Sequence, residues 1–163
     1  MVAAWLRWSG TADEVWLLPS FAHPFNKPMW AFEHRVALCR ALASAVGDWV
    51  VVCEIERELP RPSYTIDSLD ALAERHPNRR FIWAMGADNL ADWHRWKHPE
   101  RMAEHYGMCV VGRSGYDAAG EGLVFPEVSS TLVRERMAQG LPIDHLVPQG
   151  VRACLQRLDN IDL

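Results

Sequence analysis

A triplet of hydroxyl residues near the end of the chain is the first candidate for chemistry. Ser129, Ser130 and Thr131 stand in a row, and Arg134 follows one helical turn later. Hydroxyl groups and free backbone N–H groups at a helix start can hold a phosphate, and an arginine one turn on can neutralise its charge. Serine and threonine are also the commonest helix caps, so the triplet alone favours ordinary capping.

A second candidate is the turn Gly86-Ala87-Asp88-Asn89, which follows a predicted buried strand at 81–85. The glycine permits a close approach of the backbone, and the carboxylate of Asp88 could bond a ribose hydroxyl or orient a neighbour. In the alternative interpretation this is an ordinary strand-to-helix turn with Asp88 as its cap. The residues alone leave both interpretations open.

The segment from Trp93 to His98 places aromatic rings beside positive charges. Trp96 could stack on a heteroaromatic ring or a nucleobase. Packing of Trp93 or Trp96 in the core is at least as compatible with the sequence. His94 and His98 are four residues apart, a spacing that puts two imidazoles on one helix face, but no third metal ligand accompanies them. We therefore expect no metal site here.

Two further cations follow predicted strands. Lys27 lies in the proline-broken loop after the strand at 15–18, and Arg113 directly follows the strand at 108–111. Each side chain could contact a phosphate or point into water. Ligands of α/β proteins bind at the carboxyl ends of the strands, so the position of Arg113 favours a functional role.

Apolar runs typical of buried strands alternate with segments of helical spacing. The predicted strands are 15–18, 49–53, 81–85 and 108–111. The predicted helices are 2–9, 36–46, one that Thr65 caps and Pro77 ends, a short stretch to Trp96, one from Pro99, one through Met137 and one near 151–158. This order predicts an α/β fold with a Rossmann-like, doubly wound, mainly parallel sheet. Ligands should then meet the loops after Leu18, Cys53, Met85 and Val111.

The bulk properties limit the class of protein. A chain of 163 residues with 49% apolar content suits a single domain spanning 1–163. The net charge of -4 gives no general attraction to nucleic acid or an anionic membrane, and no apolar run could span a bilayer. We expect a cytoplasmic protein with neither as a partner. Its four widely spaced cysteines predict buried thiols.

Taken in order, these segments resemble the bacterial nicotinate-mononucleotide adenylyltransferases of the nucleotidyltransferase superfamily. The resemblance extends over most of the chain and rests on motifs that are specific together. They are Val15-Trp-Leu-Leu-Pro19 with Lys27, Glu56-Arg57, Ser63-Tyr-Thr-Ile-Asp67, Gly86-Ala-Asp-Asn-Leu90, Trp96, Val110-Val-Gly-Arg113, Ser129-Ser-Thr131 with Arg134, and Leu146-Val-Pro148.

The resemblance implies adenylyl transfer from ATP, with Mg²⁺, to nicotinate mononucleotide, which yields deamido-NAD and pyrophosphate in NAD biosynthesis. It implies that backbone groups around Thr65 bind the nicotinate ring and that Trp96 stacks on it. Asp88 and Arg113 complete the mononucleotide site. The residues implied for ATP and its phosphates are Lys27, Gly86, Ser129, Ser130, Thr131 and Arg134.

The chain departs from that family at its beginning. The family starts with a strand and a Gly-Ser-Phe-x-Pro-x-His-x-Gly-His turn, whose two histidines bind ATP phosphates, and this sequence has no such turn. We therefore expect an N-terminally truncated chain whose sheet lacks its first, central strand. The catalytic residues stay unknown, and we expect impaired transfer. A neighbouring chain in a homo-oligomer could fill the gap.

Other hypotheses stay open beside this one. The chain could be a non-catalytic nucleotide-binding or regulatory remnant of the same fold. It could also be a nucleic-acid-binding module built on its tryptophan, arginine and lysine stretch, although the acidic net charge argues against this. The residues do not decide between nicotinate and nicotinamide mononucleotide as substrate.

Overall fold

The structure is a computed structural model that describes residues 1–25, 28–113, 124–126 and 128–159. Its α-helices are α1 (Val2–Trp8), α2 (Phe32–Val46), α3 (Thr65–Arg75), α4 (Pro99–Tyr106), α5 (Ser130–Ala138) and α6 (Gln149–Asp159). Two 3-10 helices are η1 (Ile55–Arg57) and η2 (Ala87–Arg95). Its strands are β1 (Val15–Leu17), β2 (Val50–Val52), β3 (Trp83–Gly86), β4 (Met108–Arg113) and β5 (Val124–Phe125).

Every strand pair in the described part of the chain is parallel. β1 pairs with β2, and β4 lies between β3 and β5. Among these residues no ladder joins the two-stranded sheet to the three-stranded one. The predicted parallel α/β fold is confirmed, because parallel strands need the helical crossovers that the chain supplies. The predicted loss of a central strand stays a prediction.

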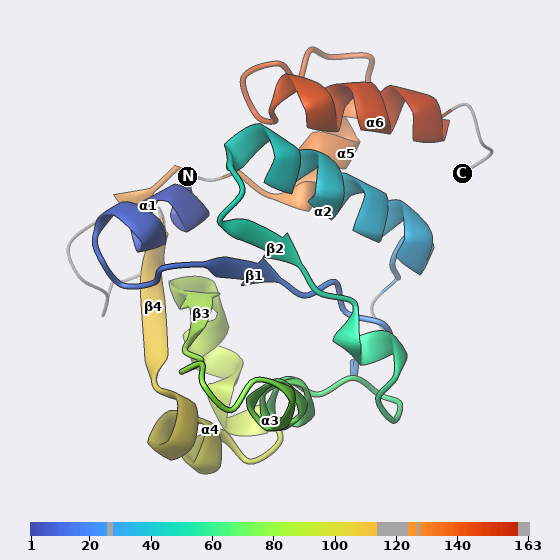
Figure 1. Ribbon diagram of the computed structural model, residues 1–163. Helices are drawn as coiled ribbons and strands as arrows, with labels where there is room; N and C mark the ends of the chain where they lie inside the picture. Colours follow the sequence, from blue (N-terminus) through green and yellow to red (C-terminus); the bar gives the residue numbers. More distant parts are fainter. Residues whose placement is uncertain (26–27, 114–123, 127, 160–163) are drawn as a thin grey trace.

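Helices cover both faces of the strands. α2, α5 and α6 lie on one side of β1 and β2, while α3 and α4 lie on the other (Figure 1). Each side has its own core. One joins Ile66, Leu69, Trp83, Met85 and Met102, and the other joins Val133, Ile143, Val151 and Leu155. Two cores on opposite sides of the strands are what a doubly wound fold requires.

Helix α3 illustrates how the pattern produces the element. Ile66, Leu69 and Leu72 recur at helical spacing, and their side chains are 1%, 5% and 2% exposed. Burial of this stripe stabilises the helix against the core. The prediction that Thr65 caps the helix was wrong, because Tyr64 is the N-cap and Thr65 is the first helical residue. The backbone N–H of Thr65 therefore lies in the first turn of α3, where N–H groups have no hydrogen-bond acceptor within the helix.

Several boundaries differ from the predicted ones because of packing. α2 begins at Phe32, four residues before the predicted start at Val36, since the ring of Phe32 is buried and meets Phe21 edge-on. The charged loop 54–62 contains η1, and β4 extends to Arg113. Within the described residues, no helix has both the length and the apolar character that a membrane crossing requires.

The cysteines are less buried than expected. All four are free thiols, but only Cys154 is fully buried, and Cys39, Cys53 and Cys109 are half-buried. Burial raises the pKa of the Cys39 and Cys53 thiols, which reduces the thiolate fraction at neutral pH. The prediction of buried thiols is therefore correct for Cys154 alone.

Candidate functional site

The loops that follow β1 and β2 are bound to each other. The N–H of Ser63 donates to the carbonyl of Ala22 at 2.8 Å, and the hydroxyl of Ser63 accepts from the N–H of Ala22 at 3.1 Å. The carboxylate of Glu56 accepts from the N–H of Phe21 at 2.9 Å and from the hydroxyl of Ser68 at 3.4 Å. Glu56 is 8% exposed, so this carboxylate joins η1, α3 and the loop after β1 below the surface.

The segment that follows β3 meets the same two loops. The ammonium of Lys97 lies 2.7 and 2.8 Å from the two carboxylate oxygens of Asp67, in the first turn of α3. The guanidinium of Arg95 lies 4.8 Å from the ring centre of Phe25, in the loop after β1. Loops after three parallel strands therefore converge, at the strand ends where the sequence predicted a ligand.

This convergence links Thr65 to Trp96. Lys97, the residue after Trp96, contacts Asp67, two residues after Thr65. The indole of Trp96 is half-buried, with its ring centre 5.2 Å from that of Trp83 and 5.7 Å from that of Trp93. Trp96 therefore packs on the core and still reaches the surface, so both interpretations of this residue fit. An indole held in this way can stack on a planar ring.

Gly86 and Asp88 stand at the end of β3. A Cβ on Gly86 would lie only 2.2 Å from Oδ1 of Asp88, so any larger residue here would force that carboxylate to move. Gly86 is the N-cap of η2, and Asp88 lies in its first turn. The alternative in which Asp88 caps the helix was therefore wrong. Because Gly86 has no Cβ, the carboxylate of Asp88 itself can lie close to the backbone of Gly86.

The three hydroxyl residues 129–131 do not all have the same role. Ser129 caps α5, because its hydroxyl accepts a hydrogen bond from the N–H of Leu132 at 3.1 Å. Ser130 and Thr131 are exposed in the first turn, and the guanidinium of exposed Arg134 donates to the Thr131 hydroxyl at 3.3 Å. The capping interpretation holds for Ser129. The other three side chains stay accessible at the positive end of a helix.

Other candidates are placed less completely. Lys27 lies outside the described residues. The backbone of Arg113 ends β4, opposite Phe125, but the structure does not describe its side chain. His94 and His98 do not share a helix face, because η2 ends at Arg95 and His98 is left-handed, with φ 51°. Over the described ranges, no three His, Cys, Asp or Glu side chains gather to hold a metal ion.

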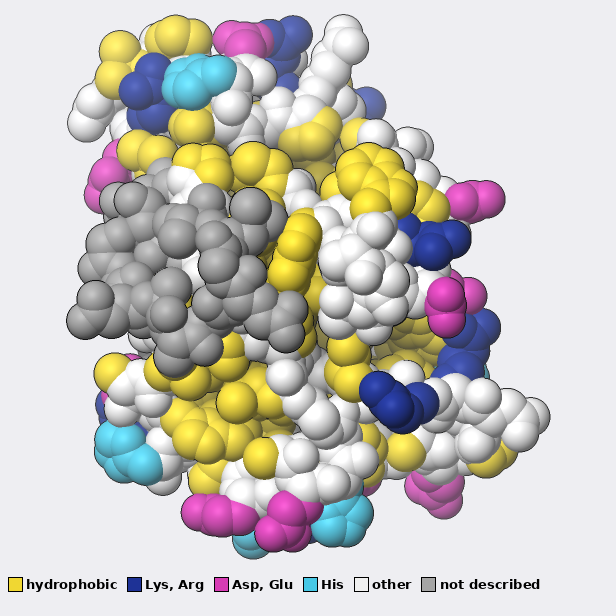
Figure 2. Space-filling model, turned by 90° about the vertical axis from the view of Figure 1, so that its left-hand side faces the viewer, with side chains coloured by type: hydrophobic (Ala, Val, Ile, Leu, Met, Phe, Trp, Pro, Cys, Tyr) yellow, Lys and Arg dark blue, Asp and Glu magenta, His cyan; other side chains and the backbone are white. Residues whose placement is uncertain are grey.

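A different surface is apolar. A groove beside α1 is lined by Met1, Ala4, Trp5, Trp8, Ser9 and Phe125. Figure 2 shows hydrophobic side chains at the surface of this side of the molecule, and Trp8 is 79% exposed. A triphosphate needs cations and hydrogen-bond donors, and the described residues that line this groove include neither an arginine nor a lysine. We therefore do not assign the nucleotide to this groove.

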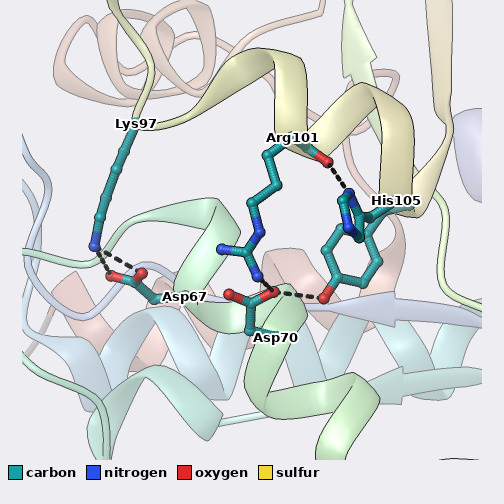
Figure 3. Close-up of polar contacts among 6 residues, drawn as sticks. Asp67, Asp70, Lys97, Arg101 and His105 are labelled. Atoms are coloured by element: carbon teal, nitrogen blue, oxygen red, sulfur yellow. Dashed lines mark hydrogen bonds and ion pairs between the residues drawn. The ribbon is translucent and has the colours of Figure 1, made fainter.

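Sequence reasoning missed the contacts that hold the site together. Figure 3 shows that Lys97 reaches Asp67 and that Arg101 reaches Asp70. The hydroxyl of Tyr106 also donates to Asp70. A signal existed, since Asp67 and Asp70 are three apart while Lys97 and Arg101 are four apart, so each pair can share a helix face. Nothing local indicated that the acidic and basic pairs would face each other.

Parallel strands whose following loops converge at their carboxyl ends are the arrangement of an α/β ligand-binding protein. The sequence profile of the cytidylyltransferase-like family matches residues 1–136 of the chain. A crystal structure from Vibrio parahaemolyticus, described as a putative nicotinate-nucleotide adenylyltransferase, superposes with a TM-score of 0.69. The superposition covers 92% of this chain and 86% of that one at 20% sequence identity, which establishes the shared fold.

Closer relatives narrow the class. A protein of Myxococcus xanthus strain DK1622, named a probable nicotinate-nucleotide adenylyltransferase, is 41% identical over 149 residues. The match covers 91% of this chain and 78% of the relative. A relative of the same name in Anaeromyxobacter dehalogenans strain 2CP-1 is 40% identical, with 93% and 82% covered. The chain belongs to the nicotinate-nucleotide adenylyltransferase family.

Proposed function

We propose that this chain binds nicotinate mononucleotide and ATP and joins them to form deamido-NAD and pyrophosphate. The observation that carries the proposal is the convergence of the loops after β1, β2 and β3, through the contact of Lys97 with Asp67. It brings the segment of Thr65, with its helix-start N–H, to the segment of Trp96. A flat anionic ring is complementary to a stacking face beside backbone donors.

The nicotinate end of the mononucleotide lies, in this proposal, between the first turn of α3 and the indole of Trp96. The N–H of Thr65 donates to the ring carboxylate, and the positive end of the helix dipole favours that charge. Asp88, at the end of β3, accepts from a ribose hydroxyl. Arg113 neutralises the phosphate of the mononucleotide.

ATP binds, in this proposal, toward α5. Ser130, Thr131 and Arg134 offer hydroxyls, backbone donors and one cation to its phosphates, and Lys27 supplies a second cation. Gly86 acts indirectly in this proposal, because its lack of a Cβ lets the Asp88 carboxylate stay at the end of β3. ATP enters as its Mg²⁺ complex. Mg²⁺ is usually held by phosphate oxygens, waters and one or two carboxylates, so the lack of a three-ligand cluster among the described residues fits this substrate-borne ion.

The reaction needs no covalent intermediate. A phosphate oxygen of the mononucleotide attacks the α-phosphorus of ATP, the bond from that phosphorus to the bridging oxygen breaks, and pyrophosphate leaves. The side chains named above position the two substrates and neutralise charge, which is the main demand of phosphoryl-type transfer. We further propose one domain over 1–163 that works in the cytoplasm, where the four free thiols would stay reduced.

Product formation tests the proposal. The chain is incubated with ATP, Mg²⁺ and nicotinate mononucleotide, and deamido-NAD and pyrophosphate are quantified. We expect equal amounts of the two products, at a low rate. Binding of both substrates without product would favour the non-catalytic alternative, and the absence of binding would overturn the proposal.

A pair of matched variants separates the site from general packing. Trp93 and Trp96 both lie against Trp83, with ring centres 5.0 and 5.2 Å from it. W96A should weaken binding of the mononucleotide at least about ten-fold, the cost of a lost stacking partner. W93A removes similar packing and should leave that affinity within about three-fold.

A further inference from the structure

Helix α3 is joined to the segment 97–106 by two ion pairs, one helical turn apart (Figure 3). Lys97 pairs with Asp67, and Arg101 pairs with Asp70 at 2.8 Å. The two pairs use the same helix, the same charges and similar distances. They differ in their position along α3, because Asp67 lies in the first turn and Asp70 does not.

The contacts of the first pair lie on both sides of Thr65 in the sequence. Besides its two contacts with Asp67, the ammonium of Lys97 lies 4.8 Å from the ring centre of Tyr64. One cation therefore touches the residue before Thr65 and the residue two positions after it. Since Trp96 directly precedes Lys97, the same cation fixes where the indole stands relative to the start of α3.

The ion pair is poorly suited to a purely stabilising role. The side chains of Lys97 and Asp67 are 36% and 27% exposed, and exposed ion pairs add little to the free energy of unfolding. Lys97 directs two of the three N–H groups of its ammonium at the carboxylate oxygens of Asp67, which holds it at the start of α3. What the pair does provide is a fixed separation between two segments.

We propose that Asp67 and Lys97 are positioning residues that set the spacing between the Thr65 backbone and the Trp96 indole, and thereby the affinity for the pyridine ring. The inference rests on the proposed function of this site. Neither side chain touches the substrate in this account. A small misplacement of a binding group can cost a large factor in affinity, so the pair controls binding without contributing a contact.

The second pair supplies the matched control. D70N removes the negative charge of the carboxylate that contacts Arg101 and the hydroxyl of Tyr106, just as D67N removes the charge of the carboxylate that contacts Lys97. It leaves the first turn of α3 unchanged. A role in general docking of the helices predicts equal effects of D67N and D70N, whereas a positioning role predicts an effect of D67N alone.

Calorimetric titration with nicotinate mononucleotide, and separately with ATP, tests the inference on the full chain. D67N and K97M should each weaken mononucleotide binding about ten-fold, and the double variant no more than either alone. K97R, which can still pair with Asp67, should restore most of the affinity. ATP affinity should stay within about two-fold in every variant, as should mononucleotide affinity in D70N and R101M. Thermal unfolding of each variant verifies that it is folded.

Each other outcome overturns the inference in a recognisable way. Equal weakening by D67N and D70N would show a general packing role. Weakening by K97M but not by D67N, confined to the nicotinate and absent with nicotinamide mononucleotide, would show that Lys97 binds the ring carboxylate directly. If the unmodified chain does not bind the mononucleotide, both this inference and the proposed function fail. If it binds and the variants bind equally well, the inference alone fails.

Discussion

The carboxylate of Glu56 accepts a hydrogen bond from the N–H of Phe21, 35 residues earlier in the chain, at 2.9 Å. Through its other oxygen it accepts from Ser68 of α3. One buried side chain therefore holds the loop after β1 against the start of the helix that carries Thr65. Together with the hydrogen bonds between Ser63 and Ala22, this carboxylate fixes the arrangement of the two loops.

Removal of this carboxylate should destabilise the protein. E56A leaves the N–H of Phe21 without its acceptor, while the hydroxyl of Ser68 keeps the carbonyl of Tyr64. The loss should lower the free energy of unfolding by about 1–3 kcal/mol in urea titrations. E33A is the control, since the Glu33 side chain is 67% exposed, and its effect should stay within about 0.5 kcal/mol. Equal effects of the two substitutions would contradict the role assigned to Glu56.

Proline at position 65 should remove a single hydrogen-bond donor. Thr65 is the first residue of α3, where proline is tolerated, and the extended backbone of Tyr64, at φ -108° and ψ 138°, suits a residue before proline. T65P should weaken binding of nicotinate mononucleotide about ten-fold or more, because a charge-assisted hydrogen bond is lost. T65A keeps the N–H and should bind normally. Normal binding by T65P would exclude the Thr65 N–H as a ligand.

Alanine at position 86 should displace Asp88. The new Cβ would start 2.2 Å from Oδ1 of Asp88, and the short side chain can rotate away, so we expect less than about 1 kcal/mol of lost stability but a clear loss of product formation. Gly150 is the control, because its added Cβ meets nothing closer than 3.6 Å and it lies in α6. G150A should be neutral or slightly stabilising. Full activity of G86A would show that the position of Asp88 is unimportant.

Two substitutions, one at the cap of α5 and one within it, should distinguish a residue that stabilises the helix from a residue that binds ATP. S129A removes the cap on Leu132 and should cost about 1 kcal/mol in urea unfolding, with little change in ATP affinity. R134M should leave stability within about 0.5 kcal/mol, since the side chain is exposed. It should weaken ATP binding about ten-fold by the loss of one charged phosphate contact. The reverse pattern would assign both residues to helix structure only.

The protein should lose stability at alkaline pH as the hydroxyl of Tyr106 ionises. Burial and the hydrogen bond to Asp70 raise the pKa of Tyr106 to about 12. The unfolded value is about 10, so the folded state holds the proton more tightly, and the stabilisation present below pH 10 is lost as the pH rises toward 12. Near pH 8 the free energy of unfolding of the unmodified chain should exceed that of Y106F by about 1 kcal/mol. This difference should shrink between about pH 10 and 12. A constant difference in urea titrations would contradict this.

The periodic parts of the fold could be predicted from the sequence, and their ends could not. Ile66, Leu69 and Leu72 define α3 because helical spacing and burial agree, and Pro99 starts α4 as proline at a first turn predicts. The cap of α3 was misplaced by one residue, since Tyr64 caps by its backbone conformation, without a capping side chain. Such a cap leaves no compositional signal.

Within the candidate site, motifs predicted which residues to consider but not the contacts that hold them. Gly86 and Asp88 could be predicted as a candidate turn, yet the carboxylate that approaches Gly86 belongs to Asp88 itself, which depends on side-chain rotation. The contact of Lys97 with Asp67 spans 30 residues. Contacts of this kind form only when segments that are distant in the sequence meet in the folded chain, so a local pattern cannot reveal them.

A crystal structure of the chain with deamido-NAD tests the central claim most directly. The account predicts the pyridine ring against the indole of Trp96, its carboxylate at the N–H of Thr65, and the adenylate end toward Ser130 and Arg134. A pyridine ring bound away from Trp96 and the start of α3, for example in the apolar groove beside α1, would contradict it.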